Sequence, residues 1–478
     1  MKKSFIKSTF IYTVVKYAAL ILGFLRELIN ARQLGPETFG VLGNLLLILS
    51  YFLYANFGTI YAMTKECSIL EKNKEKVNKI INGTFSFLVI LSGLFLIGGM
   101  VYLNIYKYSP MGVYIFLVCL IAIFDQFRLY FTNYFRVKDN LRQINNIELI
   151  YHSLSAVLTV LLISKWGIYG ALIALLIADI VTFISCVKRV ENLRLVADKE
   201  VFIRLISVGI PLLIYNLGFY ILTTIDRMFI IKFLSKEELG YYTFASQIAK
   251  ATLMFLNSVL FIYYPEALRK LNLENNLSKD SIIDEMKKLN GMLEILGVLL
   301  TIAGMILIVP FVNLLMKQYV PSIVIYRILV LSVIANQLCY FVSVFLLSNN
   351  LQFKLVNLQV VTSLIAVAVQ YAFIESKLGL FGVSIGTLII NIFYSLSQYF
   401  ILCRILKIEN YFKFIYSSIG KYIVFCAGSV IIFSKIQRLE LVVLGVLLIF
   451  SFLYIREVKN LFLQMKNLNN KRRTGHDK

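Results

Sequence analysis

Ionisable side chains and histidine, on which soluble enzymes and metal sites depend, are scarce in this sequence. Charged residues make up 15% of its 478 residues, and histidine occurs twice. The sequence contains no H-x-x-x-D pattern, no phosphate-binding glycine loop and no cluster of metal-ligating residues. We therefore expect no metal, no cofactor and no catalytic residue, and we predict that the protein is not an enzyme.

Cysteine is also sparse. The six cysteines are dispersed, lie mostly inside apolar segments and form no C-x-x-C pair; they are Cys67, Cys119, Cys186, Cys339, Cys403 and Cys426. Isolated cysteines in apolar surroundings behave as small buried hydrophobic residues. The sequence therefore predicts neither disulfides nor a zinc site.

Long apolar runs dominate what is present. Hydrophobic residues make up 59% of the chain, and the mean hydropathy is +0.79. A spanning helix needs about 20 mostly apolar residues, and continuous rather than alternating runs favour helices over barrel strands. We predict an all-α integral membrane protein with 14 transmembrane helices, at residues 8–30, 39–63, 81–103, 112–134, 147–165, 167–187, 202–225, 240–264, 289–311, 321–347, 355–374, 380–403, 414–434 and 438–455. The charged segment 265–288 is predicted to form a separate helix at the membrane surface.

The distribution of positive charge predicts the orientation of these helices. With the N-terminus in the cytoplasm, the cytoplasmic segments hold 32 lysines and arginines and the outer segments hold nine, as the positive-inside rule requires. Both termini are therefore predicted to be cytoplasmic. The net charge of +22 follows from this asymmetry and from contact with anionic headgroups, so we expect no nucleic acid at the basic tail around Lys471–Arg473.

The chain contains an internal repeat. Residues 34–40 (LGPETFG) and 234–240 (LSKEELG) share leucine, glutamate and glycine at an offset of 200, and residues 167–174 and 379–386 share a Gly-x-x-Gly start at an offset of 212. The repeat is six helices long, so both copies enter the membrane from the same side as a parallel repeat. We predict four parts: an N-terminal six-helix lobe (1–190), a cytoplasmic linker (191–201), a C-terminal six-helix lobe (202–406), and two additional helices with a basic cytoplasmic tail (407–478).

Several segments of both lobes are similar to one family. These are L-G-F-L-R-E at 22–27, A-R-x-L-G-P-E-x-F-G at 31–40, G-I-P-L at 209–212, I-D-R at 225–227 and E-L-G-Y-Y at 238–242. They resemble Wzx-type polysaccharide and O-antigen flippases of the multidrug/oligosaccharidyl-lipid/polysaccharide exporter superfamily, over roughly residues 1–403. The resemblance implies a fold like that of MATE transporters and lipid II flippases, in a bacterial plasma (inner) membrane.

The resemblance also implies a substrate and its handling. The substrate would be an undecaprenyl-diphosphate-linked oligosaccharide, carried from the inner to the outer leaflet by alternating access. Further implied partners are membrane lipids and a polysaccharide polymerase or chain-length protein. Related lipid II flippases have a Gly-Phe-x-Arg-Asp stretch in the first span that supplies a cavity arginine and acid. Arg26 and Glu27 match those positions, with glutamate in place of aspartate. The motifs do not identify the glycan.

Charged residues inside the predicted spans are the candidate site residues, because an ion at mid-bilayer costs about 2.5–3.5 kcal/mol and usually faces a partner or a hydrated cavity. Guanidinium groups can bind phosphate oxygens bidentately. The candidates for substrate binding are Arg26, Glu27, Arg128, Arg227, Lys250 and Arg327, and those for ion coupling are Asp179, Asp226, Glu148 and His152.

Structural alternatives stay open for some of these candidates. Asp125 and Arg128 are three residues apart on one helix face, so a structural ion pair is an equal alternative to a substrate contact. Asp226 and Arg227 lie near a span end and could be interfacial. Glu148 and His152 are four residues apart, and a solvated helix end is an alternative to proton coupling.

Two other functions are weighed against the flippase. A multidrug antiporter for organic cations should carry unpaired acids in its spans, whereas here seven lysines and arginines slightly outnumber six acids. A membrane enzyme of polysaccharide assembly would need a sizeable loop or a histidine–aspartate motif, and the predicted outer loops are short.

Overall fold

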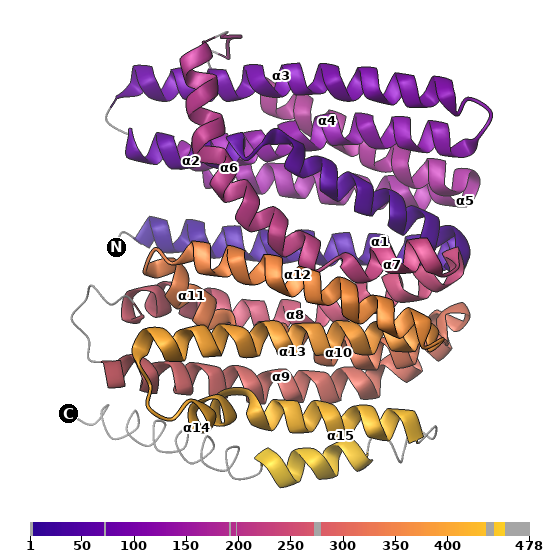
Figure 1. The fold of residues 1–478 in the computed structure, drawn as a ribbon. Coiled ribbons are helices and arrows are strands. Elements are labelled where there is room, and N and C mark those ends of the chain that lie inside the picture. The colour runs from indigo at the N-terminus through magenta and orange to yellow at the C-terminus, as the bar shows by residue number, and fades with distance from the viewer. Residues whose placement is uncertain are drawn as a thin grey trace, which may run out of the picture. The chain divides into compact units, whose positions relative to one another are not determined.

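The computed structural model describes residues 3–70, 73–190, 193–196, 198–271, 279–435 and 444–454 (Figure 1). All regular structure in these ranges is helical. In chain order the elements are α1 (Lys3–Phe52), η1 (Leu53–Asn56), α2 (Thr59–Ile69), α3 (Lys74–Ile105), α4 (Pro110–Val137), α5 (Leu141–Val187), α6 (Lys199–Leu222), α7 (Ile225–Phe233), α8 (Lys236–Lys270), α9 (Lys279–Leu315), η3 (Lys317–Tyr319), α10 (Ser322–Gln337), α11 (Tyr340–Ser348), α12 (Gln352–Glu375), α13 (Gly379–Leu406), α14 (Tyr411–Ile415), η4 (Tyr416–Gly420) and α15 (Lys421–Lys435). A further short apolar helix covers Leu444–Tyr454.

The helices account for the fourteen predicted spans. Within the described residues, ten helical segments are long and apolar enough to cross a membrane. Two of them, α1 and α5, each contain two predicted spans, joined at non-helical residues Gly35 (φ 74°) and Gly167 (φ 53°). Glycine tolerates this left-handed backbone, and Pro36 cannot donate a helical hydrogen bond. The remaining two predicted spans correspond to α8 and to Leu444–Tyr454.

The prediction of a separate surface helix at 265–288 is wrong for the described residues. The start of this segment continues α8 as far as Lys270, and residues from Lys279 onward form the first turns of α9. Neither glycine nor proline occurs between Lys279 and Asn290, so nothing in the chain breaks the helix before the apolar span begins. Residues 272–278, and the basic tail from 455 onward, lie outside the described residues.

The chain divides into two compact units. The first comprises residues 1–220 and 235–240, and the second comprises residues 221–234 and 241–478. The first unit packs α5 against α1 and α4, and α3 against α4. The second packs α13 against α10 and α12, and α9 against α10. The lobe and linker boundaries deduced from the repeat stay a prediction.

Within the first unit, the two copies of the L-x-x-E-x-x-G motif meet backbone to backbone. A Cβ atom added at Gly40 would lie 1.9 Å from the carbonyl oxygen of Lys236, and one added at Gly240 would lie 1.9 Å from the carbonyl oxygen of Pro36. The contact is reciprocal at the repeat offset, since 36 corresponds to 236 and 40 to 240. Only glycine leaves room for such an approach.

Candidate functional site

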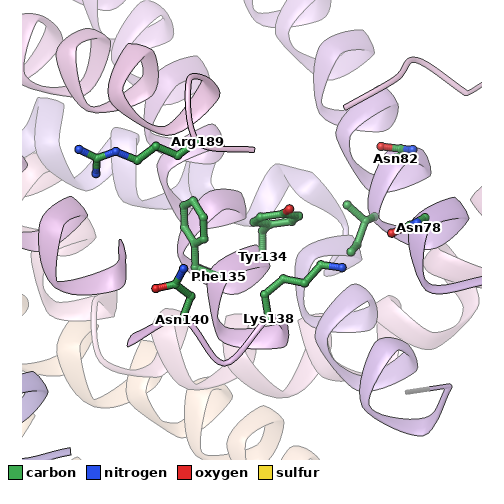
Figure 2. A pocket seen from close by; sticks show the side chains of 8 residues that line it. Asn78, Asn82, Tyr134, Phe135, Lys138, Asn140 and Arg189 are labelled. Atoms are coloured by element: carbon green, nitrogen blue, oxygen red, sulfur yellow. The ribbon is translucent and has the colours of Figure 1, made fainter. Parts of the chain in front are cut away.

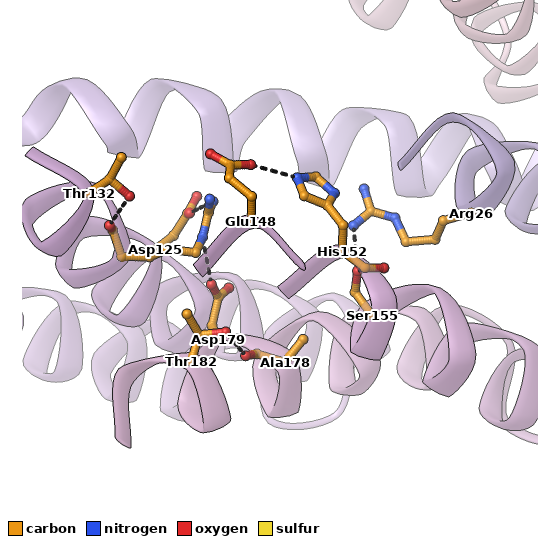
Figure 3. Close-up of polar contacts among 10 residues, drawn as sticks. Arg26, Asp125, Thr132, Glu148, His152, Ser155, Ala178, Asp179 and Thr182 are labelled. Atoms are coloured by element: carbon orange, nitrogen blue, oxygen red, sulfur yellow. Dashed lines mark hydrogen bonds and ion pairs between the residues drawn. The ribbon is translucent and has the colours of Figure 1, made fainter. Parts of the chain in front are cut away.

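The first unit gathers six of the predicted site residues, together with Asp125, on α1, α4 and α5. Figure 3 shows most of this group, with Arg26, Asp125, Glu148, His152 and Asp179 labelled. We call this group the first-unit charge cluster; its members are Arg26, Glu27, Asp125, Arg128, Glu148, His152 and Asp179. With four carboxylates, two guanidinium groups and a neutral histidine, its formal charge is −2. The cluster as defined is therefore acidic, and the cation Lys16 of α1 lies within electrostatic reach of its member Glu148.

Arg128 is the centre of a buried ion triad. Its guanidinium forms an ion pair with Asp125 one turn earlier on α4, and its Nε donates to Asp179 Oδ1 at 3.0 Å. The side chain of Asp179, on the second half of α5, is 0% exposed. The guanidinium also lies 4.0 Å from the ring centroid of Tyr151, which suits a cation–π contact. The i,i+3 pair predicted as an alternative thus forms, and Asp179 extends it between helices.

Arg26 is occupied by its own neighbour. Its Nε and Nη2 donate to Glu27 Oε1 at 3.1 and 2.7 Å, and its Nη1 donates to Ser155 Oγ at 3.5 Å. Both ion-pair side chains are 13% exposed. Asn30 Nδ2 donates to the other carboxylate oxygen of Glu27 at 3.5 Å. A phosphate ligand at Arg26 would therefore have to share or displace the carboxylate of Glu27.

Glu148 and His152 lie on consecutive turns of α5. Glu148 Oε2 is 3.5 Å from His152 Nε2. His152 Nδ1 is buried and has no hydrogen-bond partner among the residues that the structure describes. Gly23 of α1 makes room for the imidazole, because a Cβ there would lie 3.3 Å from Nδ1. The side chains of His152 and Glu148 are 19% and 21% exposed, so the pair is partly buried.

The second unit holds a different group around Asp226. This carboxylate is 8% exposed and accepts hydrogen bonds from the Tyr242 hydroxyl, from Thr387 Oγ1 at 3.2 Å and from the backbone N–H of Arg227 at 2.7 Å. Gln370 Nε2 in turn donates to Thr387 Oγ1 at 3.1 Å. Asp226 is therefore held by neutral donors of α7, α8 and α13 rather than by a cation.

Three cations of the second unit have no carboxylate partner in the described part of the chain. Arg227 Nη2 donates to Ser246 Oγ at 2.8 Å instead of pairing with Asp226. Lys250, one turn beyond Ser246 on α8, is exposed and lies within electrostatic reach of both Arg227, which repels it, and Asp226, which attracts it. Arg327 on α10 is only 6% exposed, and its guanidinium lies 5.7 Å from the ring of Phe433 on α15. We call Arg227, Lys250 and Arg327 the second-unit cations.

Tyr242→Phe tests whether the hydrogen bond from the Tyr242 hydroxyl to Asp226 stabilises the protein. The substitution removes the hydroxyl that donates to a buried carboxylate, so we expect a loss of about 1–3 kcal/mol in the free energy of unfolding. Thermal unfolding of the purified protein would measure it. Tyr371→Phe, on an exposed tyrosine of the same unit, is the control and should cost less. Equal losses would show that the hydroxyl does not support Asp226.

Sequence reasoning missed Tyr151, Tyr242, Ser246 and Thr387. These neutral side chains carry no charge signal inside an apolar run. The spacing of Tyr242, Ser246 and Lys250 at four-residue intervals places them on one face of α8, and that periodicity was available from the sequence. Thr387 lies 161 positions from Asp226, and no local pattern connects the two.

A G-x-S-x-G sequence occurs at residues 382–386. It lies inside α13, where Ser384 Oγ donates to the backbone oxygen of Leu380 at 2.8 Å. A nucleophile elbow needs a sharp turn between a strand and a helix. Ser384 is therefore placed as an ordinary helix serine rather than as an exposed nucleophile.

Comparison with solved structures places this fold among known membrane transport proteins. The chain is similar to the lipid II flippase MurJ in an inward closed conformation, with a TM-score of 0.69 and 15% identity, over 94% of this chain and 100% of that chain. It is also similar to an inward-facing multidrug resistance MATE family transporter of the MOP superfamily, with a TM-score of 0.66 and 18% identity, over 81% of this chain and 96% of that chain. These similarities confirm the predicted fold class, a multi-pass helical membrane protein of MATE and lipid II flippase type.

The family follows from the sequence match. A family model described as "Polysaccharide biosynthesis protein" matches residues 5–266. The chain therefore belongs to the polysaccharide biosynthesis protein family, which confirms the resemblance inferred from its motifs. A curated relative, the Lsg locus putative protein 1 of Haemophilus influenzae, is 24% identical over 290 residues, which is 56% of this chain and 67% of that protein.

Proposed function

We propose that the protein is a flippase that carries an undecaprenyl-diphosphate-linked oligosaccharide from the inner to the outer leaflet of a bacterial plasma membrane. The family and the fold support transport of a polysaccharide precursor. The observation that carries the proposal is the group of second-unit cations. Arg227, Lys250 and Arg327 have no carboxylate within ion-pair distance among the described residues, although the same unit buries Asp226 and Glu294.

An uncompensated cation among membrane helices is costly, so it requires a partner that arrives with the substrate. A diphosphate carries at least two negative charges. The forked donors of Arg227 and Arg327 suit its oxygens, and the ammonium of Lys250 adds a mobile positive charge. Binding of the headgroup would relieve the repulsion between Lys250 and Arg227. We propose that Arg26 and Glu27 contribute to the same substrate path from the first unit.

The first-unit charge cluster is proposed to couple transport to an ion. Its formal charge of −2 favours uptake of a proton or a small cation, and a buried carboxylate beside a second carboxylate is suited to titration. Asp179, Glu148 and His152 are the proposed coupling residues. Asp226 belongs to the second unit and is proposed to couple there through its hydrogen bonds with Tyr242 and Thr387.

The same acidic cluster favours a second candidate function, an antiporter for organic cations. The fold is shared with a multidrug resistance MATE family transporter. Two of the four carboxylates are already paired with Arg128, however, and a third is paired with Arg26. The second-unit cations would also repel a cationic substrate. We therefore propose the anionic lipid-linked substrate as the principal one.

Neutralising Arg227 and Lys250 together tests the flippase. In the double variant Arg227→Gln/Lys250→Gln, we expect transport of a fluorescent undecaprenyl-diphosphate-linked oligosaccharide into the outer leaflet of proteoliposomes to fall at least tenfold, because each charge-assisted contact to phosphate is worth about 1.5–3 kcal/mol. Lys232→Gln, an exposed lysine at the end of α7, is the control and should transport normally.

Substrate choice separates the two functions. Normal flipping by the double variant would contradict a role of these cations in binding the diphosphate. Efflux of an organic cation by the wild-type protein, with no movement of the lipid-linked oligosaccharide, would favour the antiporter. A changed covalent product instead of a changed leaflet would reveal an enzyme.

A further inference from the structure

A polar cavity lies in the first unit, formed by residues at the ends of α3, α4 and α5 (Figure 2). Its volume is about 330 Å³, and its lining comprises Asn78, Ile81, Asn82, Tyr134, Phe135, Lys138, Asn140 and Arg189. The lining shares no residue with the first-unit charge cluster. Lys138, Asn140 and Arg189 follow or precede predicted spans at the end of the unit where the sequence predicts the cytoplasm.

The floor and the rim of this cavity differ in chemistry. Ile81, Tyr134 and Phe135 are buried and form an apolar, aromatic floor. Cations and amides form the rim. No carboxylate belongs to the lining, and Asp139, although next to Lys138 in sequence, is not part of it.

Several rim donors are available to a ligand. Neither the ammonium of Lys138 nor the amide of Asn78 has a hydrogen-bond or ion-pair partner in the ranges that the structure describes. Asn140 uses its oxygen to cap α5 at Gln143 N–H (3.3 Å), and Asn82 uses its oxygen to accept from Arg194 N–H (3.3 Å). Their amide nitrogens are left as donors. Arg189 Nη1 donates to Gln143 Oε1 at 2.7 Å, an exposed contact with a neutral group that an anion could replace.

We propose that this cavity binds a phosphate ester whose alcohol carries hydroxyl groups, such as the glycerol phosphate headgroup of an anionic lipid or a sugar phosphate. Lys138 supplies the positive charge for the phosphate, and Arg189, whose guanidinium points away from Lys138 in Figure 2 and binds Gln143, would turn toward the cavity to add to it. The amides of Asn78, Asn82 and Asn140 suit hydroxyl groups, because each presents both a donor and an acceptor. The volume lies at the small end of the range of about 300–1,000 Å³ found for small-molecule sites.

The cavity also borders the predicted linker between the lobes. Asn82 accepts from the backbone of Arg194, and Ser86, one turn further along α3, accepts from Val196 N–H at 2.7 Å. A ligand bound at Asn82 would therefore contact the side chain that fixes residues 193–196 to α3. We therefore expect a bound ligand to affect how residues 193–196, which lead into α6, are held against α3.

Titration calorimetry of the full-length protein in detergent tests the site with two probes, dioctanoyl phosphatidylglycerol and N-acetylglucosamine 1-phosphate. We expect Lys138→Gln/Arg189→Gln to weaken binding at least tenfold. The control Arg142→Gln/Lys188→Gln removes the same charge from exposed residues outside the lining and should change binding less than twofold. Asn78→Asp, which adds a carboxylate to the rim, should also weaken binding.

The probes distinguish the source of the phosphate. Binding of phosphatidylglycerol alone identifies a lipid-headgroup site, binding of the sugar phosphate alone identifies a saccharide site, and binding of both identifies a general phosphate-ester site. Failure of both probes to bind overturns the proposal. Equal weakening by the two double variants also overturns it, because the binding would then follow net charge alone. Neither result depends on transport, so the proposed function is tested separately.

Discussion

Arg128→Ala is expected to destabilise the first unit by about 3–5 kcal/mol and to abolish transport. The guanidinium is the cation that compensates Asp125 and Asp179, and the side chain of Asp179 is fully buried. Removing it would leave two carboxylates facing each other among membrane helices. Such a site must take up a proton or rearrange, and both outcomes disturb the packing of α4 against α5.

The buried cysteines provide the measurement. All six are free and buried, so a thiol-reactive fluorophore labels them only as the protein unfolds, and the midpoint temperature reports stability. Asp179→Asn in the Arg128→Ala background should recover part of the loss, because it removes one uncompensated charge. Arg142→Ala, on an exposed arginine, is the control and should have little effect. A midpoint for Arg128→Ala equal to that of the control would show that the triad contributes nothing to stability.

The transmembrane spans were predictable from the sequence because a spanning helix depends only on the apolar residues within its own segment. Twenty apolar residues identify a membrane helix wherever they pack. The breaks at Gly35 and Gly167 were located too, since span ends at 30 and 165 and span starts at 39 and 167 flank them. The prediction of a separate helix at 265–288 is wrong for the described residues of that segment. Charge does not stop a helix, and the described ends of this segment continue α8 and α9.

The partners of the site residues were predictable only within a helix. Asp125 and Arg128 are related by spacing alone, and so are Glu148 and His152. Asp179 reaches Arg128 from 51 positions away, and no local rule gives the rotation of its helix. Arg26 differs from Arg128, because its ion-pair partner is Glu27, the next residue in the sequence. Hydropathy gives the depth of a side chain and not the face on which it lies.

The two units differ in how their charged residues are partnered. The first-unit charge cluster has an excess of carboxylates, whereas the second-unit cations have no carboxylate partner in the ranges described above. A coupled transporter needs two sites of opposite preference, one for the driving cation and one for the anionic headgroup. This difference supports two proposed roles. Asp179 and its neighbours would bind the coupling ion, and Arg227, Lys250 and Arg327 would bind the substrate.

Gly240→Ala is expected to separate the two repeat motifs and to abolish transport. The added methyl group would lie 1.9 Å from the carbonyl oxygen of Pro36 and 2.7 Å from its carbon. Both atoms belong to the backbone, so no side-chain rotation can relieve the overlap. Gly40→Ala should act in the same way through the carbonyl oxygen of Lys236. Overpacking of this kind costs about 1–3 kcal/mol, and here it acts on a contact to which both repeat motifs contribute.

Because both substitutions disrupt one contact, their effects should not add. Once the first methyl group has separated the segments, the second finds space, so Gly40→Ala/Gly240→Ala should cost less than the sum of the single variants. Gly98→Ala on α3 is the matched control, since nothing lies within 4 Å of a Cβ there, and alanine in a helix should leave stability unchanged or raise it by up to about 1 kcal/mol. Thiol labelling and flipping of the lipid-linked oligosaccharide would be measured for all four proteins. Additive losses, or a Gly240→Ala protein that behaves like Gly98→Ala, would mean that the repeats do not need this approach in the working protein.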